Sequence, residues 1–307
     1  MRTLRLVTRG SPLALWQAHA LKDALTGADP AMPEPEIVIV RTTGDKVRDR
    51  ALSEVGGKGV FTKEIDHYVL HDEADIAVHS MKDVETVFDA GLVLASMLPR
   101  ADPRDAFLST VAASIADLPR GAVVGSSSIR RKAQMLRARP DLEVVLFRGN
   151  VDTRLAKLAA GEVSATLLAM AGLDRLGRAS EATAVLDADE MLPAAGQGAV
   201  GMTCRADDSA LIDLLAGIDH RETHIMVDAE RAVLARLDGS CQTPVAAHAR
   251  LDGARLTLDA LVLSEDGSRH AAASREGDVA DGIALGDDAG RELLGAAGAD
   301  LFGSRVP

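Results

Sequence analysis

Along the first two thirds of the chain, short apolar runs alternate with amphipathic stretches. This alternation predicts βαβ units around a mostly parallel sheet. The run Leu4–Thr8 predicts a strand, and Ser11 followed by Pro12 supplies an N-cap and a first helical residue for a helix that reaches Leu25. Further elements are expected in the same unit: strands over 37–40 and 75–79, and a helix over 61–71.

The alternation restarts after 99–103, where prolines and charges suit a crossing between domains. Strands are then expected over 122–125, 143–147 and 165–169, and helices over 126–139 and 151–160. The turn-rich segment 192–198 predicts a second crossing, which returns the chain to the first unit.

Beyond Arg221 the pattern changes. A helix over 223–237, a strand over 256–263 and a turn at 266–267 indicate a small antiparallel α+β domain. The prediction is therefore an α/β protein of three domains. Their expected bounds are 1–98 with 199–218, 104–192, and 221–307.

Composition narrows the function. The 307 residues carry a formal net charge of −12, which argues against a general nucleic-acid binder because counterion release needs a basic surface. Aromatic residues make up 2%, too few for base-stacking platforms. No apolar run approaches the roughly 18 residues that span a bilayer. Two cysteines give no disulfide framework, and the start of the chain leads into no signal-peptide core, so the cytoplasm is the expected compartment.

Charged and hydroxyl side chains follow the predicted strands, at the ends where open α/β sheets bind ligands. Arg9 follows the first strand, Lys82 and Asp83 follow the strand 75–79, and Arg148 follows the strand 143–147, with Arg154 one helical turn further on. If the chain crosses twice, these groups would face each other across a cleft between two units.

The segment 126–139 contains five basic residues and no acid. Its serines open a predicted helix, whose unpaired N–H groups and dipole favour an anion. The segment is therefore either a carboxylate or phosphate site or a solvated helix face, and the charge run alone does not decide between them. Arg130 and Arg131 are adjacent and cannot share one helix face, so at least one of them needs a further explanation.

Other motifs lack the context that their chemistry needs. The glycines of 196–201 match G-x-G-x-x-G, but a turn precedes them and a strand-like run follows, so they are no dinucleotide fingerprint. The pairs His67 with His71 and His220 with His224 have no third ligand, and no metal site is expected. Cys204 is expected in the core, whereas Cys241 lies in a turn, where it is either a reactive thiol or an unremarkable one.

Seven segments, taken in order, resemble the porphobilinogen deaminase (hydroxymethylbilane synthase) family over essentially the whole chain. They are Thr8–Ala18, Val55–Phe61, Asp75–Val84, Asp102–Phe107, Ser126–Arg131, Arg148–Asn150 with Arg154, and Gly239–Gln242. The resemblance implies two domains like type II periplasmic binding proteins, joined by a double crossover, and a small α+β C-terminal domain. It also implies a dipyrromethane cofactor, made from the substrate and attached through a thioether to Cys241. On that carrier the enzyme would join four porphobilinogens head to tail with release of ammonia, and then hydrolyse off the tetrapyrrole.

The resemblance also assigns roles to single residues. Asp83 matches the catalytic carboxylate of the family. Each pyrrole carries an acetate and a propionate, which guanidinium groups bind in a bidentate manner. The residues implied for this carboxylate binding are Arg9, Ser11, Lys58, Ser80, Lys82, Ser127, Ser128, Arg130, Arg131, Arg148, Gly149, Arg154 and Arg175. The expected partner is porphobilinogen alone, bound by a monomer without nucleic acid or membrane.

Three departures from the family pattern affect these expectations. Glu54 stands where a lysine is common, the segment 84–89 replaces one that usually contains proline, and Lys132 replaces a common glutamine.

Two other functions stay open from the residues themselves. A non-catalytic anion-binding protein would use the same cleft but would not need Cys241, and a nucleotide-dependent oxidoreductase rests only on the misplaced glycines.

Overall fold

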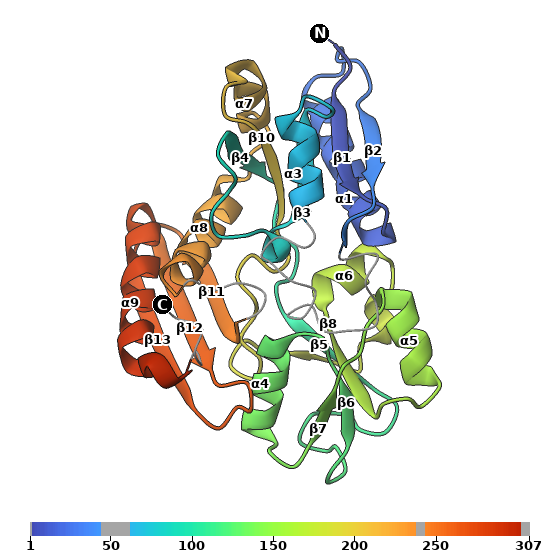
Figure 1. The fold of residues 1–307 in the computed structure, drawn as a ribbon, viewed down its shortest axis with the longest axis vertical. Coiled ribbons are helices and arrows are strands. Elements are labelled where there is room, and N and C mark those ends of the chain that lie inside the picture. The colour runs from blue at the N-terminus through green and yellow to red at the C-terminus, as the bar shows by residue number, and fades with distance from the viewer. Residues whose placement is uncertain (1, 44–61, 238–242, 302–307) are drawn as a thin grey trace. The chain divides into compact units, whose positions relative to one another are not determined.

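The computed structural model describes residues 2–43, 62–237 and 243–301, and the chain forms two compact units (Figure 1). Residues 1–101 with 199–224 make the first unit, and residues 102–198 with 225–307 make the second. The second unit contains two separate sheets. The division into three domains with the bounds expected from the sequence stays a prediction.

The first unit is built on a five-stranded sheet in the order β2-β1-β3-β10-β4. Its elements are β1 (Arg5–Arg9), α1 (Pro12–Ala28), β2 (Glu36–Val40), α3 (Lys63–Leu70), β3 (Ile76–Ser80), the 3-10 turn η2 (Met81–Asp83), β4 (Leu92–Met97), β10 (Val200–Arg205) and α7 (Ser209–Ala216). Strand β1 runs parallel to β2 and β3, whereas β10 is antiparallel to β3 and β4. The prediction of a mostly parallel sheet is therefore confirmed, because β2, β1, β3 and β4 run in one direction and β10, which comes after the second crossing, enters this sheet in the opposite direction.

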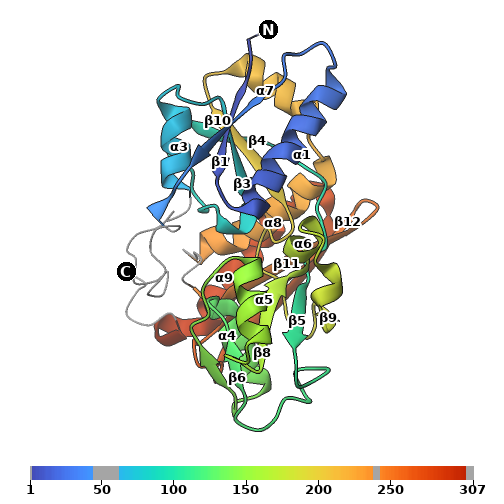
Figure 2. The same ribbon diagram turned by 90° about the vertical axis from the view of Figure 1, so that its right-hand side faces the viewer.

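The two faces of this sheet bury alternate residues of its strands. Leu6 packs in one core with residues of α1 and α7, and the next residue, Val7, packs in another core with residues of α3. Figure 2 shows α1 and α3 on opposite sides of the strands. Helix α1 begins as predicted, with Pro12 in its first turn and the Ser11 hydroxyl accepting a hydrogen bond from the Ala14 N–H at 3.3 Å.

The second unit contains another five-stranded sheet, in the order β7-β6-β8-β5-β9. Its elements are β5 (Asp105–Ser109), β6 (Val123–Gly125), α4 (Ile129–Ala138), β7 (Glu143–Val145), α5 (Val151–Ala159), β8 (Ala165–Ala169), α6 (Met170–Arg175), η3 (Ala179–Glu181) and β9 (Ala184–Leu186). This sheet is mixed as well, since β5 is antiparallel to β8 and β9 while β6 is parallel to β7 and β8. Phe107 and Met135 pack on the face that α4 covers, and Leu108 and Leu158 pack on the face of α5.

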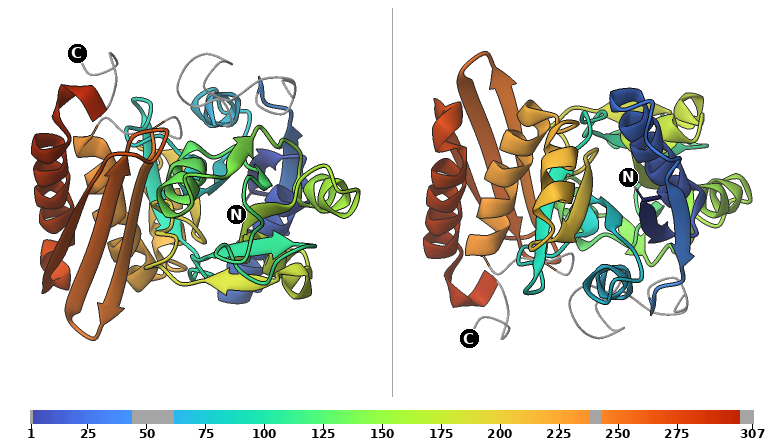
Figure 3. Two further views of the ribbon diagram at one scale, coloured as in Figure 1. Left: turned by 90° about the horizontal axis from the view of Figure 1, so that it is seen from below. Right: turned by 90° about the horizontal axis from the view of Figure 1, so that it is seen from above.

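The remaining elements form a three-stranded antiparallel sheet with long helices. They are α8 (Arg221–Arg236), β11 (Val245–Asp252), β12 (Arg255–Leu263), β13 (His270–Asp278), η4 (Val279–Asp281) and α9 (Gly282–Leu301). Side chains of α8 and α9 share one core with alternate residues of β11 and β12, such as Ala247 and Leu258. Figure 3 shows the two helices, in orange and red, lying along this sheet. This confirms the small antiparallel α+β element that the sequence predicts.

Among the helices that the structure describes, none is both long and apolar enough to cross a bilayer.

Candidate functional site

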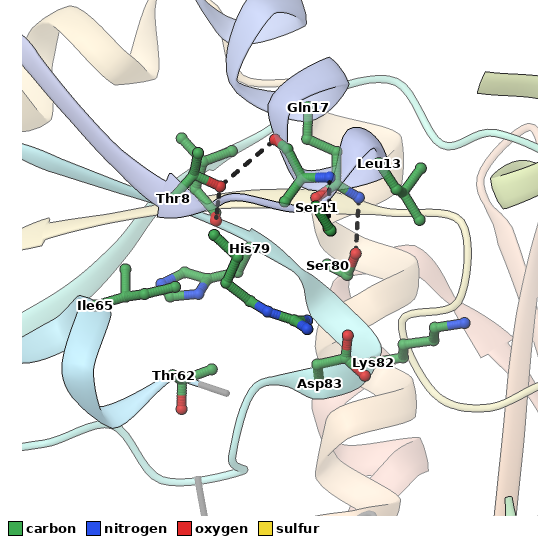
Figure 4. A pocket seen from close by; sticks show the side chains of 13 residues that line it. Thr8, Ser11, Leu13, Gln17, Thr62, Ile65, His79, Ser80, Lys82 and Asp83 are labelled. Carbon is green, nitrogen blue, oxygen red and sulfur yellow. Dashed lines mark hydrogen bonds between the residues drawn. The ribbon is translucent and has the colours of Figure 1, made fainter. Parts of the chain in front are cut away.

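A pocket of about 80 Å³ lies in the first unit where β1 and β3 end (Figure 4). Its lining joins polar residues predicted for the site with apolar residues of α1 and α3. The lining residues are Thr8, Arg9, Ser11, Leu13, Ala14, Gln17, Thr62, Ile65, Val78, His79, Ser80, Lys82 and Asp83. The structure therefore brings together five of the predicted residues from the first unit, Arg9, Ser11, Ser80, Lys82 and Asp83.

The turn η2 carries Lys82 and Asp83 directly after β3. Its first residue, Met81, is 2% exposed and donates its backbone N–H to the carbonyl of Ala199 at 3.1 Å. The Met81 side chain lies against Gly201 of β10 so closely that a Cβ at residue 201 would be 2.1 Å from the Met81 sulfur. Strand β10, with the residue before it, therefore holds the turn in place, and this fixes the direction in which the Asp83 side chain projects.

The Asp83 carboxylate is half-buried, and among the described residues it has no hydrogen-bond or ion-pair partner. Figure 4 shows the Lys82 side chain extending away from it. A carboxylate that is partly desolvated and has no such partner has acceptor capacity left for a bound ligand.

Two serines of the pocket act as hydrogen-bond acceptors within the protein. The Gln17 amide donates to the Ser80 hydroxyl oxygen at 2.7 Å (Figure 4), and the Ser11 oxygen caps α1. Because each hydroxyl accepts here, its own hydrogen can be donated to a ligand. Gln17 is a site residue that the sequence analysis did not single out, and its partner lies 63 positions away.

His79 lines the same pocket and is 4% exposed. Its Nε2 lies 3.2 Å from the Thr203 hydroxyl and 3.4 Å from a carboxylate oxygen of Asp66, which is also buried. These three polar groups come from β3, β10 and α3, so their proximity was not predictable from the sequence.

In the second unit, Ser127 and Ser128 lie between β6 and α4. The Ser128 hydroxyl caps α4 by accepting from the Arg131 N–H at 3.4 Å, as the sequence predicts for the serines that open this helix. The Ser127 hydroxyl instead donates to the carbonyl of Phe147 at 2.6 Å. Its hydrogen is therefore used inside the protein, and Ser127 ties the ends of β6 and β7 together.

The paired arginines at the start of α4 are both buried, with 4% of Arg130 and 6% of Arg131 exposed. Each binds the Asp105 carboxylate, with 2.7 Å between Nη2 of Arg130 and Oδ2 and 2.7 Å between Nη2 of Arg131 and Oδ1. This explains how two adjacent arginines can both be accommodated, since both side chains turn toward the same acid of β5. The two arginines lower the pKa of Asp105 far below its usual value, against the opposing effect of its burial.

Three guanidinium groups of the second unit lie near one another, and we call Arg131, Arg148 and Arg154 the basic cluster. Burial lowers the pKa of Arg154 to about 10, and the positive charges of Arg131 and Arg148 add to this effect. A bound anion would relieve both causes, because it replaces lost hydration and offsets the repulsion between like charges. The basic cluster therefore has the electrostatics of an anion site.

Backbone geometry places Arg154 in this cluster. Gly149 has a φ of +132°, and its carbonyl accepts from Nε of Arg154 at 3.0 Å. Asn150 then caps α5 by accepting from the Thr153 N–H at 2.9 Å. A side chain at residue 149 would be strained at this φ and would also meet Thr153, so glycine is required between Arg148 and the helix.

Arg175 ends α6 and donates from Nη2 to the carbonyl of Gly198 at 2.6 Å. Its burial lowers its pKa to about 10. The structure thus ties Arg175 to the segment that the sequence identifies as the second crossing.

Two predicted site residues, Lys58 and Cys241, lie outside the described residues. The cleft expected between the two units stays a prediction. Cys204 is fully buried in β10, which confirms the prediction of a core cysteine, and burial raises the pKa of its thiol to about 11. Over the described ranges, no group of three or more His, Cys, Asp and Glu side chains is placed to hold a metal ion.

Asp105 is the main site-related residue to which the sequence analysis gave no role. It lies in one of the seven segments, and it is the first residue of a strand that was not predicted. The available indication was the charge run over 126–139, because Arg130 and Arg131 cannot share one helix face, and an arginine on a buried face needs an acid as its partner.

Solved structures of similar fold include the VFT2 domain of Bordetella pertussis BvgS, with 15% identity, a TM-score of 0.45, and coverage of 74% of this chain and 93% of that one. An arginine-specific periplasmic binding protein of Salmonella typhimurium has 10% identity and a TM-score of 0.41, with coverage of 73% and 94%.

Relatives with known names are much closer in sequence. A porphobilinogen deaminase of Paracoccus denitrificans is 54% identical over 300 residues, which cover 97% of this chain and 96% of the relative. A chloroplastic porphobilinogen deaminase of Oryza sativa is 50% identical over 307 residues, which cover 98% and 86%. Residues 4–213 match the family's dipyromethane cofactor binding domain, and residues 224–295 match its C-terminal domain. With a carboxylate at the end of β3 and a basic cluster in its second unit, the chain belongs to the porphobilinogen deaminase family.

Proposed function

We propose that this protein is a porphobilinogen deaminase, which joins four porphobilinogens head to tail on a covalently bound dipyrromethane, releases ammonia at each step, and then hydrolyses off hydroxymethylbilane. The observation that carries the proposal is the half-buried Asp83 carboxylate, which lies at the end of β3 in a pocket shared with Arg9 and Lys82. The family match identifies the class of reaction, and the pocket supplies the group that the reaction needs.

Loss of ammonia from porphobilinogen leaves a cation whose positive charge extends to the pyrrole N–H. A fixed carboxylate that accepts this N–H stabilises the cation and orients the ring for attack by a pyrrole α-carbon. In this assignment Asp83 acts as an electrostatic stabiliser, and Arg9, Ser11 and Ser80 bind the acetate and propionate groups beside it. The carbon–nitrogen bond breaks first, as ammonia leaves; the new carbon–carbon bond then forms between the attacking α-carbon and the cation, and the attacking carbon finally releases its proton.

The basic cluster fits a ligand with several carboxylates, because its guanidinium groups are partly desolvated and repel one another. When bound, dipyrromethane supplies the free α-carbon to which the substrate units are joined. Arg131, Arg148 and Arg154 would hold its carboxylates, and Ser128 keeps a hydroxyl hydrogen to donate. Arg175 and the backbone of Gly149 would also bind carboxylates of this ligand. Lys58, as a further carboxylate-binding residue, and Cys241, as the thioether attachment point, complete the proposal, and both lie outside the described residues.

The test of this function compares Asp83→Asn with Asp89→Asn, which changes an exposed acid six positions further on. Loss of the charge at residue 83 is expected to lower kcat for porphobilinogen consumption by about 100-fold to 1,000-fold, and the control should stay within about twofold of wild type. Near-normal turnover of Asp83→Asn would show that the carboxylate has another role.

The attached cofactor has its own test, which does not depend on turnover. Intact mass and the colour with Ehrlich's reagent should show an adduct of two pyrrole units on the wild type and none on Cys241→Ser. An unmodified wild type that consumes no porphobilinogen would favour an anion-binding protein instead. A monomer in the cytoplasm, acting without nucleic acid, remains the expectation for the whole protein.

A further inference from the structure

Asp105 is the point where one buried carboxylate meets two guanidinium groups. Its side chain is fully buried at the start of β5, and it accepts from Arg130, Arg131 and the Gln197 amide. The distances are 2.7 Å from Nη2 of Arg130, 2.7 Å and 3.2 Å from Nη2 and Nε of Arg131, and 2.8 Å from Gln197. Such a complete set of donors is what a buried carboxylate needs to stay ionised.

The charges of this network do not cancel, since two guanidinium groups and one carboxylate leave a net charge of +1. Arg130 uses its Nη1 to donate to the Leu192 carbonyl at 2.6 Å, and its Nε is buried without a hydrogen-bond partner. Within the part of the chain that the structure describes, the Arg130 guanidinium is therefore surrounded by protein atoms.

Arg131 differs from Arg130 in what remains open. Of its five guanidinium N–H bonds, two point to Asp105 and one to the Leu167 carbonyl at 2.9 Å. The other two have no partner among the described residues. Arg131 also lies near enough to Arg154 to contribute to the lowered pKa of that side chain. Three N–H bonds thus anchor the Arg131 guanidinium to Asp105 and Leu167, and its two other N–H bonds are left for a ligand of the basic cluster.

We propose that Asp105 is a positioning residue for anion binding, which holds the Arg131 guanidinium so that its two remaining N–H bonds serve a carboxylate bound at the basic cluster. The identity of that carboxylate rests on the proposed function, whereas the geometry of the anchor does not. Asp105 and Arg130 therefore do not contact the ligand themselves. Arg131 contacts it, in the position that its hydrogen bonds to Asp105 set.

The test uses citrate as a tricarboxylate probe, in a Cys241→Ser background so that no covalent group competes for the basic cluster. The measured quantity is the citrate concentration that half-saturates the protein, determined by isothermal titration calorimetry at constant ionic strength. Asp105→Asn keeps the shape of the side chain but removes its charge, and we expect this concentration to rise at least tenfold. Asp141→Asn, which breaks an exposed pair with Arg139 in the same unit, is the matched control and should change it by less than twofold.

Asp105→Asn will also lower the Tm, by roughly 6 to 20 °C, because it leaves buried guanidinium groups without their counter-charge. The double variant Asp105→Asn with Arg130→Met restores the net charge of +1 and should recover most of this Tm. It still lacks the anchor, so its citrate concentration should stay high. This separates positioning from a role in stability alone.

Three outcomes would overturn the proposal: an unchanged half-saturating citrate concentration in Asp105→Asn, its return to the parent value in the double variant together with the Tm, or a parent protein that binds no citrate. Failure of the proposed function is seen separately, as a wild-type protein that consumes no porphobilinogen. The citrate measurement decides the role of Asp105 in either case.

Discussion

Replacement of Gly201 by alanine should disturb the site from a position outside its lining. The new Cβ would be 2.1 Å from the Met81 sulfur and 3.0 Å from Cδ1 of Leu94, whereas carbon atoms in contact are about 3.5–4.0 Å apart. Met81 is 2% exposed, so it cannot move into solvent and must shift by about 1.5 Å within the core. Overpacking of this kind costs about 1–3 kcal/mol, which corresponds to a fall in Tm of roughly 2 to 12 °C.

The same displacement should also lower activity. Met81 begins the turn that ends at Asp83, and a displacement of a reacting group by about 1 Å can lower the rate about 100-fold. We therefore expect kcat/KM for porphobilinogen to fall by about two orders of magnitude in Gly201→Ala, measured at a temperature where the variant remains folded.

The control is Gly27→Ala, a helical position in the same unit at which a Cβ would meet nothing within 4 Å. It should leave kcat/KM unchanged and raise the Tm slightly, because alanine is the better helix former. Adding Met81→Ala to Gly201→Ala removes the overlapping atoms, so the double variant should lose less than the sum of the two single losses. A wild-type kcat/KM in Gly201→Ala would refute the view that β10 holds the turn in place.

Three further outcomes follow from charge and burial. In Cys241→Ser, the remaining thiol of Cys204 should react with a disulfide reagent at pH 8 only after unfolding, because its pKa is raised to about 11 and its side chain is buried; rapid labelling of the native protein would contradict this. Arg154→Gln should weaken citrate binding by about 30-fold or more, while Arg178→Gln, which removes an exposed arginine paired with Asp152 and Glu181, should not; equal losses would mean that only the overall charge matters. Asp105 has a lowered pKa in the folded state, so the stability that it contributes is complete above its unfolded pKa of about 4 and is lost as the pH falls through the folded value. The difference in urea midpoint between wild type and Asp105→Asn should therefore shrink below about pH 4. A constant difference would argue against an ionised Asp105.

Local features were the most predictable from the sequence. Ser11 and Pro12 fix the start of α1, and the end of β3 leads into Lys82 and Asp83 as expected. Such features depend on a few neighbouring residues, which the sequence shows directly. The burial of Cys204 is predictable for the same reason, since it lies in an apolar run.

Features that join distant parts of the chain were not predictable in the same way. Strand β5 was missed, and its direction in the sheet depends on where the crossing delivers it. Asp105 lies 25 positions before Arg130, and the sequence shows two arginines without showing which acid binds them. The charge run therefore left an anion site and a solvated helix face both open, and it could not show that Arg130 and Arg131 share one buried acid.

The place of β10 in the first sheet has a consequence for synthesis of the protein. This strand separates β3 from β4, yet it is made about 100 residues after β4 ends. At about 5 to 20 residues per second, the ribosome needs roughly 5 to 20 s to supply it, and during that time β3 and β4 expose unpaired edges. The nascent chain is therefore open to aggregation in this interval, and β10 cannot hold the turn that carries Asp83 in place before residue 201 has emerged.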